Sequence, residues 1–276
     1  MESAGREAHE AQIPGSDDFV FPLDSEMWRI NHQWIGLLYG PAAAILQIAH
    51  PMIGRGVADH SDFRADSLGR LTRTLRDVNS IAFGTYGEAN EVRDRLRQVH
   101  RKVRGPTYNA FEPELMVWVL ATLVYAAATA YERWIGPLTN ERKQALLADF
   151  ARFGNFFGLQ EQFVPNSWSG FEQYYASMVH SGILGSDPIS ADLTRHLVHP
   201  RDSLLMRAFG AILDFLPVET LPPELLAPLG LRSTWRTRVS MAFFSQLIQR
   251  VFPLLPQRWR LYPESRLRLE REPDTR

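Results

Sequence analysis

The stretch MVWVLATLVYAAATAY, residues 116–131, is the most apolar run in the chain and decides the fold class. It is shorter than the roughly 20 residues that an α-helix needs to cross a bilayer, and Glu132 and Arg133 close it. An apolar run of this length is typical of a helix buried in the centre of a helical protein. We therefore predict a core helix over about residues 114–134 and an all-α fold around it.

Apolar residues recur at helical spacing on both sides of this run. The pattern predicts helices over the ranges 27–38, 41–50, 67–82, 88–103, 139–157, 168–182, 188–197, 201–215, 222–228 and 233–251. Residues 52–63 carry two glycines and mixed polarity, which favours a loop or a broken helix. No alternating strand pattern, internal repeat or low-complexity linker interrupts the series, so we expect a single globular domain.

The two ends of the chain differ from its body. Residues 1–18 are polar and predict a flexible tail, which the apolar segment FVFPL at 19–23 would fix to a body extending to residue 262. Residues 263–276 are strongly charged and predict a second tail. The N-terminal stretch has neither the basic start nor the apolar run of a signal peptide, so we expect a cytoplasmic protein without a transmembrane segment.

Composition excludes several kinds of partner and chemistry. Among 276 residues, 30 Lys and Arg oppose 31 Asp and Glu, so there is no overall charge to attract nucleic acid. The chain contains no cysteine, which excludes disulfides, thiolate metal sites and a cysteine nucleophile. The segment VFPLLPQRWRLY at 251–262 is apolar and basic, which fits either peripheral membrane contact or ordinary packing.

Two neighbouring predicted helices carry polar residues that can act together. Arg70, Arg73 and Thr74 stand at positions i, i+3 and i+4, so their side chains can reach one common point. The commoner interpretation of such spacing is a solvated helix face. His100 lies at the edge of the next apolar stripe, where a partly buried imidazole is more often hydrogen-bonded to the backbone than bound to a metal. In a chain without cysteine, however, a single imidazole beside an apolar cavity is also what a haem iron requires.

A second cluster consists of His50, His60 and Asp62. Two imidazoles and a carboxylate can form a three-ligand site for zinc or non-haem iron, although their spacing is not that of a helical metal motif. Histidines next to serine and aspartate more often serve as local caps or turn partners. No GxSxG motif occurs, which argues against a serine hydrolase.

Several ordered blocks together resemble one protein family. The blocks are LQIAHP at 46–51, GVADHSDFRAD at 56–66, RLTRT at 70–74, FG at 83–84 and VHRKVRG at 99–105, followed by Tyr108 and Trp118. They are similar to the oxygenase family that contains the catalytic domain of bacterial latex-clearing proteins and the MpaB-type oxygenase. The resemblance covers roughly residues 25–250.

The resemblance implies a globin-like helical fold around haem b, iron protoporphyrin IX. The iron-binding histidine of the latex-clearing members matches His100, and the arginine and threonine of their Arg-x-x-Lys-Thr helix match Arg70 and Thr74. The lysine of that motif, which can bind iron in a closed latex-clearing enzyme, falls on Arg73. An arginine stays protonated and cannot serve as an ordinary iron ligand. Arg73 would instead donate hydrogen bonds to iron-bound oxygen or to a haem propionate. The glutamate proposed as catalytic in those enzymes has no position that can be matched, so polymer cleavage does not carry over.

The resulting hypothesis is a haem-dependent oxygenase that uses dioxygen and an apolar small molecule. His100 would bind the iron, while Arg70, Arg73 and Thr74 would position and polarise the oxygen. His50 and His60 belong to the shared blocks and are expected to pack and hydrogen-bond near the haem edge. Two alternatives stay open: a haem-binding or apolar-ligand-binding protein without turnover, and a non-haem metal hydrolase that uses His50, His60 and Asp62.

Overall fold

The chain was analysed as a computed structural model that describes residues 15–63, 67–198, 212 and 214–272. In this part of the chain the regular elements are helices, and β-structure is limited to isolated bridges. The all-α prediction is therefore confirmed. The elements are α1 Glu26–Asn31, η1 Trp34–Tyr39, α2 Gly40–Ala49, α3 Pro51–His60, α4 Ser67–Phe83, α5 Tyr86–His100, α6 Pro113–Trp134, α7 Asn140–Phe156, η2 Glu161–Phe163, α8 Trp168–His180, α9 Pro188–Val198, α11 Pro223–Leu226, α12 Trp235–Val251, η3 Phe252–Leu254, α13 Gln257–Arg260 and α14 Pro263–Arg271.

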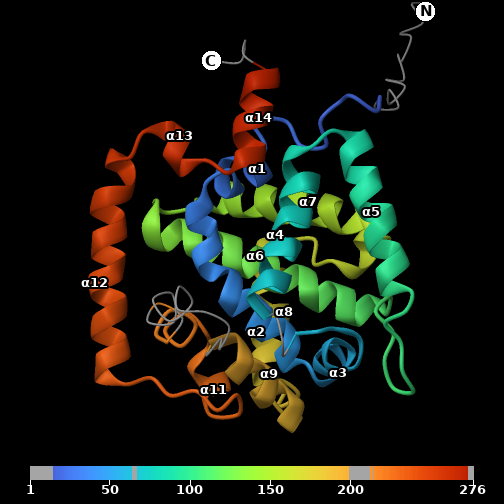
Figure 1. Cartoon of the computed structure of the whole chain (residues 1–276), viewed down its shortest axis with the longest axis vertical. Coiled ribbons are helices and arrows are strands. Elements are labelled where there is room, and N and C mark those ends of the chain that lie inside the picture. Colours follow the sequence, from blue (N-terminus) through green and yellow to red (C-terminus); the bar gives the residue numbers. More distant parts are fainter. Residues whose placement is uncertain (1–14, 64–66, 199–211, 213, 273–276) are drawn as a thin grey trace, which may run out of the picture.

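Helix α6 crosses the middle of the molecule and packs against α2, η1 and α7 (Figure 1). The Trp118 indole is fully buried and donates to the Leu46 carbonyl of α2 at 2.9 Å. Beside it, the amide of Gln47 donates to the Thr122 hydroxyl at 2.9 Å. By length and composition α6 could cross a membrane, as could the bent pair Trp34–Ala49 and Pro51–His60, but 61% of the most apolar window of α6 is buried in the fold. The predicted core helix is present, at Pro113–Trp134.

The segment expected to be a loop or broken helix at 52–63 is helical as far as His60. Its glycines permit close packing. A Cβ on Gly54 would lie 2.7 Å from the Ile48 carbonyl, and one on Gly56 would lie 3.1 Å from the Val103 side chain. The expectation of a loop or broken helix was wrong because each glycine destabilises a helix by only about 1 kcal/mol. In α3 the two glycines are needed because the helix packs closely against its neighbours.

The single helix predicted over 27–38 is divided into α1 and η1. The division falls where the backbone pairs with the distant C-terminal part of the chain. Gln33 forms an isolated bridge with Leu261, and the Tyr262 amide donates to the His32 carbonyl at 3.2 Å. These contacts between distant segments cannot be read from local helical spacing.

Helices α4 and α5 form an antiparallel hairpin with a tight connection at Gly84 and Thr85 (Figure 1). A Cβ on Gly84 would lie 2.2 Å from the Ser80 carbonyl, so the connection requires glycine. Thr85 and Glu88 form a capping box that begins α5. The Asp77 carboxylate and the Arg95 guanidinium form an ion pair across the hairpin and fix the relative height of the two helices.

The charged segment expected to be a C-terminal tail forms helix α14 over Pro263–Arg271, which packs against α4. Arg268 is 2% exposed, and its guanidinium carbon lies 4.1 Å from the centroid of the Phe19 ring and 5.1 Å from that of Trp28. The apolar 19–23 segment is fixed to the body as predicted, since Val20 and Phe21 are fully buried. Most of the expected N-terminal tail lies outside the described residues, as does most of the helix predicted over 201–215.

Candidate functional site

His100 is the last residue of α5 and its imidazole is exposed, not partly buried as expected. Its Nδ1 lies 2.7 Å from the Leu96 carbonyl oxygen. Because a carbonyl can only accept, Nδ1 must carry the proton, and Nε2 is then the atom with the free lone pair. Val99, the preceding residue, is 54% exposed. The end of α5 therefore presents an oriented imidazole beside an apolar surface.

Arg70, Arg73 and Thr74 lie in the first half of α4. The Arg70 guanidinium carbon lies 5.6 Å from the centroid of the buried Phe63 ring. Burial and, secondarily, the charge of Arg73 lower the pKa of Arg70. Arg73 and Thr74 are exposed. This part of α4 therefore concentrates positive charge in a partly dehydrated place, which favours an anionic or polarised oxygen ligand nearby.

The hairpin register places these residues at the same end as His100. The Asp77–Arg95 ion pair and the connection at Gly84 and Thr85 place the start of α4 and the end of α5 at the same end of the hairpin. His100 lies five residues beyond Arg95, about 140° around α5 from the side that meets Asp77. The four residues therefore share one end of the hairpin, but this does not make their side chains converge.

His50, His60 and Asp62 do not converge. Among the described residues no group of three His, Asp or Glu side chains is placed to hold a metal ion, so the alternative three-ligand site is not formed. His60 Nε2 lies 3.1 Å from the Tyr108 hydroxyl, which donates to the Asp59 carboxylate at 2.7 Å. This series of hydrogen bonds joins α3 to the loop after α5. It gives His60 a local structural role.

His50 stands at the bend between α2 and α3 and is half-buried. Its Nδ1 is buried, with no hydrogen-bond partner among the described residues. Burial lowers the pKa of His50, while the Glu114 carboxylate opposes this change. No metal-binding or haem-contacting role can be assigned to His50 from these contacts.

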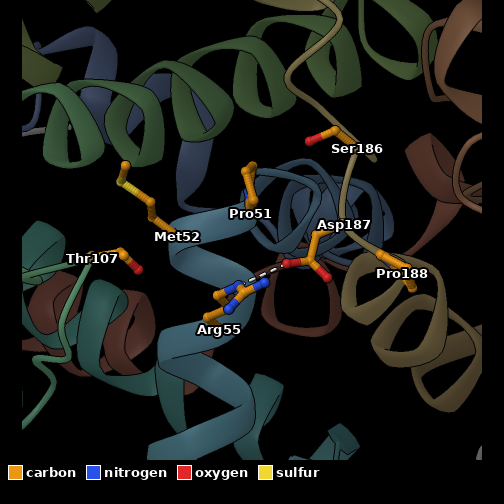
Figure 2. A pocket seen from close by; sticks show the side chains of 7 residues that line it. All are labelled: Pro51, Met52, Arg55, Thr107, Ser186, Asp187 and Pro188. Atoms are coloured by element: carbon orange, nitrogen blue, oxygen red, sulfur yellow. Dashed lines mark hydrogen bonds and ion pairs between the residues drawn. The ribbon is translucent and has the colours of Figure 1, made fainter.

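A shallow cavity of 360 Å³ opens between α3 and the start of α9 (Figure 2). Its lining residues are Pro51, Met52, Arg55, Thr107, Ser186, Asp187 and Pro188. The Arg55 Nε donates to the Asp187 carboxylate at 2.7 Å, and the pKa of Asp187 is lowered by the Ile189 amide and by Arg55. No sequence pattern indicates this pair, because Arg55 and Asp187 are far apart in the chain and form no motif. The cavity is not lined by His100 or by the α4 cluster.

The donor chemistry at the end of the hairpin fits a haem. An imidazole with Nδ1 held by a backbone carbonyl leaves Nε2 as the atom that would hold an iron ion. Arginines stay protonated and suit a propionate or a polarised oxygen. The described residues leave His100 exposed and do not enclose a haem-sized pocket around it. The fit therefore rests on the donor set and not on a preformed pocket.

The described chain is all-helical, and its ordered sequence blocks match a family model. The family described as ER-bound oxygenase mpaB/B'/Rubber oxygenase, catalytic domain, matches residues 28–250, and the chain belongs to this family. The family assignment expected from the sequence blocks is thereby confirmed.

Two mycobacterial proteins are similar to the chain. An uncharacterized protein of Mycobacterium bovis and one of Mycobacterium tuberculosis are each 28% identical to it over 148 residues. The match covers 50% of this chain and 58% of each relative, so the chain spans little more than half the length of the curated relatives it matches. No solved structure matches the chain.

Proposed function

We propose that the chain is a haem b-dependent oxygenase that acts with dioxygen on an apolar small molecule. The observation that supports this most directly is the imidazole of His100, whose Nδ1 is held by the Leu96 carbonyl at the end of the hairpin that also carries Arg70, Arg73 and Thr74. Family membership supports oxygenase chemistry in general. Oxidative cleavage of a carbon–carbon double bond is the reaction to test first.

His100 would hold the cofactor through Nε2. The Leu96 carbonyl keeps the proton on Nδ1 and fixes the plane of the ring, so that Nε2 does not have to lose a proton before it binds iron. Haem supplies the oxygen-activating redox chemistry when it is bound. The exposed Val99 and the partly buried Leu96 offer an apolar surface next to the imidazole, which suits an apolar substrate or a porphyrin face.

The α4 residues would orient the oxygen and stabilise negative charge. Arg70 is partly dehydrated against Phe63, which strengthens its interaction with an anion. Arg73 cannot bind iron because its guanidinium stays protonated, so it serves as a hydrogen-bond donor. The Thr74 hydroxyl can donate a hydrogen bond to a small polar ligand beside the first half of α4, or accept one from it.

Absorption spectra of the full chain, as purified and after haem reconstitution, test the cofactor. We expect a sharp Soret band that is lost or shifted in a His100→Ala variant. The matched control is His180→Ala, because His180 also ends a helix, is 65% exposed and has its Nδ1 2.7 Å from the carbonyl four residues earlier. An unchanged Soret band in His100→Ala, an equal loss in His180→Ala, or no haem binding by the wild-type chain would each refute the assignment.

Turnover separates an oxygenase from a haem-binding protein without activity. With a haem-loaded chain and a panel of apolar alkenes, we expect oxygen-dependent products detectable by mass spectrometry. Arg70→Gln should lower the rate while preserving the Soret band. Haem binding without products across the panel would favour the non-catalytic sensor or carrier.

A further inference from the structure

Helix α12 carries a row of exposed large apolar side chains that winds partly around the helix. Residues four apart form this row: Trp235, Val239, Phe243, Leu247 and Val251, which are 65%, 59%, 69%, 45% and 43% exposed. Because four residues exceed one helical turn by about 40°, Trp235, Val239 and Phe243 lie on the outer side and Leu247 and Val251 turn back toward the body. The row continues beyond the helix in Leu254, 81% exposed, and Trp259, 60% exposed. Isolated exposed apolar residues are ordinary, but a continuous row of this length usually marks an interaction surface.

The opposite face of α12 attaches the helix to the body. Met241 is buried, and the Phe244 ring lies 5.6 Å from that of Phe215. The Gln249 amide donates to the Arg133 carbonyl at 2.7 Å. Figure 1 shows α12 standing at the margin of the molecule, and the helix packs against α6. The side chains of Trp235, Val239 and Phe243 stay mostly exposed in the described chain.

The charge around the row differs from that of the whole protein. Residues 231–262 contain six arginines and no Asp or Glu, whereas the whole chain has 30 basic and 31 acidic residues. The arginines are Arg232, Arg236, Arg238, Arg250, Arg258 and Arg260. One acidic side chain that contacts this segment is Glu219, which accepts from the hydroxyls of Ser233 and Thr237 at 2.7 Å each.

The two exposed tryptophans each adjoin an arginine. The Arg236 guanidinium carbon lies 5.5 Å from the Trp235 ring centroid, and that of Arg258 lies 5.9 Å from the Trp259 ring centroid. Tryptophan favours the boundary between headgroups and acyl chains, and arginine beside it can reach phosphate oxygens while its stem covers apolar surface. An aromatic and basic pair thus stands at each end of the apolar row.

We propose that the outer face of α12, together with Leu254 and Trp259, is an attachment surface for the interface of an anionic lipid bilayer. An exposed apolar row flanked by arginines and bounded by tryptophans has the properties of a helix that lies in a membrane interface. Pairing with a second copy through the same face is disfavoured, because it would bring two sets of arginines together. This proposal does not depend on haem binding or on the oxygenase reaction.

Co-sedimentation of the full chain with vesicles tests the surface. One vesicle preparation contains phosphatidylcholine alone and the other contains phosphatidylcholine with phosphatidylglycerol. We expect binding to the anionic vesicles at low salt, much weaker binding to the neutral ones, and a decline with added salt because headgroup attraction is screened.

Matched variants show whether the row is responsible. A triple variant Trp235→Ser, Phe243→Ser, Leu254→Ser should bind anionic vesicles at least roughly tenfold more weakly. The control variant, Phe163→Ser, Ile183→Ser, Leu267→Ser, replaces apolar side chains that are 45%, 43% and 54% exposed elsewhere and should bind like the wild type. Circular dichroism checks that both variants fold.

A double substitution tests the contribution of positive charge without replacing any apolar residue of the row. Arg236→Gln with Arg250→Gln should reduce binding to anionic vesicles and flatten its salt dependence. Equal binding by the row variant and the control variant would overturn the proposal. So would an absence of vesicle binding combined with a lipid-free dimer, detected by analytical ultracentrifugation, that the row variant dissociates.

Discussion

Arg142 of α7 binds the buried carboxylate of Glu26 of α1 in a two-pronged ion pair, with Nε 2.9 Å from Oε1 and Nη2 2.7 Å from Oε2. Glu26 is 4% exposed, and the Arg142 guanidinium carbon also lies 4.9 Å from the centroid of the Tyr131 ring. The pair raises the pKa of Arg142. It joins the first helix to α7.

We expect Arg142→Met to lower the free energy of unfolding by about 3 kcal/mol, because it leaves a buried carboxylate without its partner. The control is Arg29→Met, since Arg29 is 53% exposed and lies 3.4 Å from the same carboxylate; it should cost less than about 1 kcal/mol. Chemical denaturation measures both. Equal losses for the two variants would contradict this account of the pair.

Stability should fall as the solution is acidified through the range in which His50 titrates. Burial lowers the pKa of His50 below its usual 6.5, so the unfolded chain takes up a proton there before the folded chain does. This loss of stability is absent above pH 6.5, where His50 is neutral in both states. It grows as the pH falls toward the pKa of His50 in the folded chain, by at most about 1.4 kcal/mol per pH unit. His50→Asn should flatten part of the decline in unfolding free energy between pH 7.5 and about 5.5. An unchanged slope would show that His50 is accessible to protons in the folded state.

His32 provides an independent check on the same principle. Burial also lowers its pKa, although hydrogen bonds to the backbone oppose this change. The double variant His32→Asn, His50→Asn should therefore flatten the pH dependence more than either single variant. Denaturation curves at matched pH values measure the difference, and a double variant no flatter than His50→Asn would exclude His32 as a contributor.

Arg73→Lys should change the iron coordination if the proposed haem site is correct. An arginine cannot lose its proton at accessible pH, whereas a lysine amine can become neutral and bind iron as the pH rises. In the haem-loaded variant we expect a transition to a low-spin spectrum at alkaline pH that the wild type lacks, measured by absorption and electron paramagnetic resonance. Arg76→Lys, an exposed position on the same helix, is the control. Identical spectra for Arg73→Lys and wild type would place residue 73 away from the iron.

Local sequence patterns located most described helices because those helices pack through regular apolar stripes. The ranges 139–157, 188–197 and 233–251 correspond to α7, α9 and α12 within a few residues. The patterns failed where a distant contact decides the local structure. The glycines of α3 are needed because the Ile48 carbonyl and the Val103 side chain lie close to them. The helix is broken before η1 because Gln33 pairs with Leu261.

The candidate site was predictable only in part. Spacing placed Arg70, Arg73 and Thr74 on one helix, and the hairpin that carries them and His100 at one end follows from Gly84 and the Asp77–Arg95 pair. The exposure of His100 was not predictable from its position near an apolar stripe, because it depends on which elements cover the end of α5. The haem assignment of these residues remains a prediction.

The position of Arg268 between Phe19 and Trp28 has a consequence for the order in which the protein is made. Residues 19–28 leave the ribosome long before α14 is translated, so the Phe19 and Trp28 rings lack their contact with Arg268 until then. Residues 19–28 therefore reach their final packing only after α14 has been made. A chain stopped before residue 263 would lack the guanidinium that covers the Phe19 and Trp28 rings.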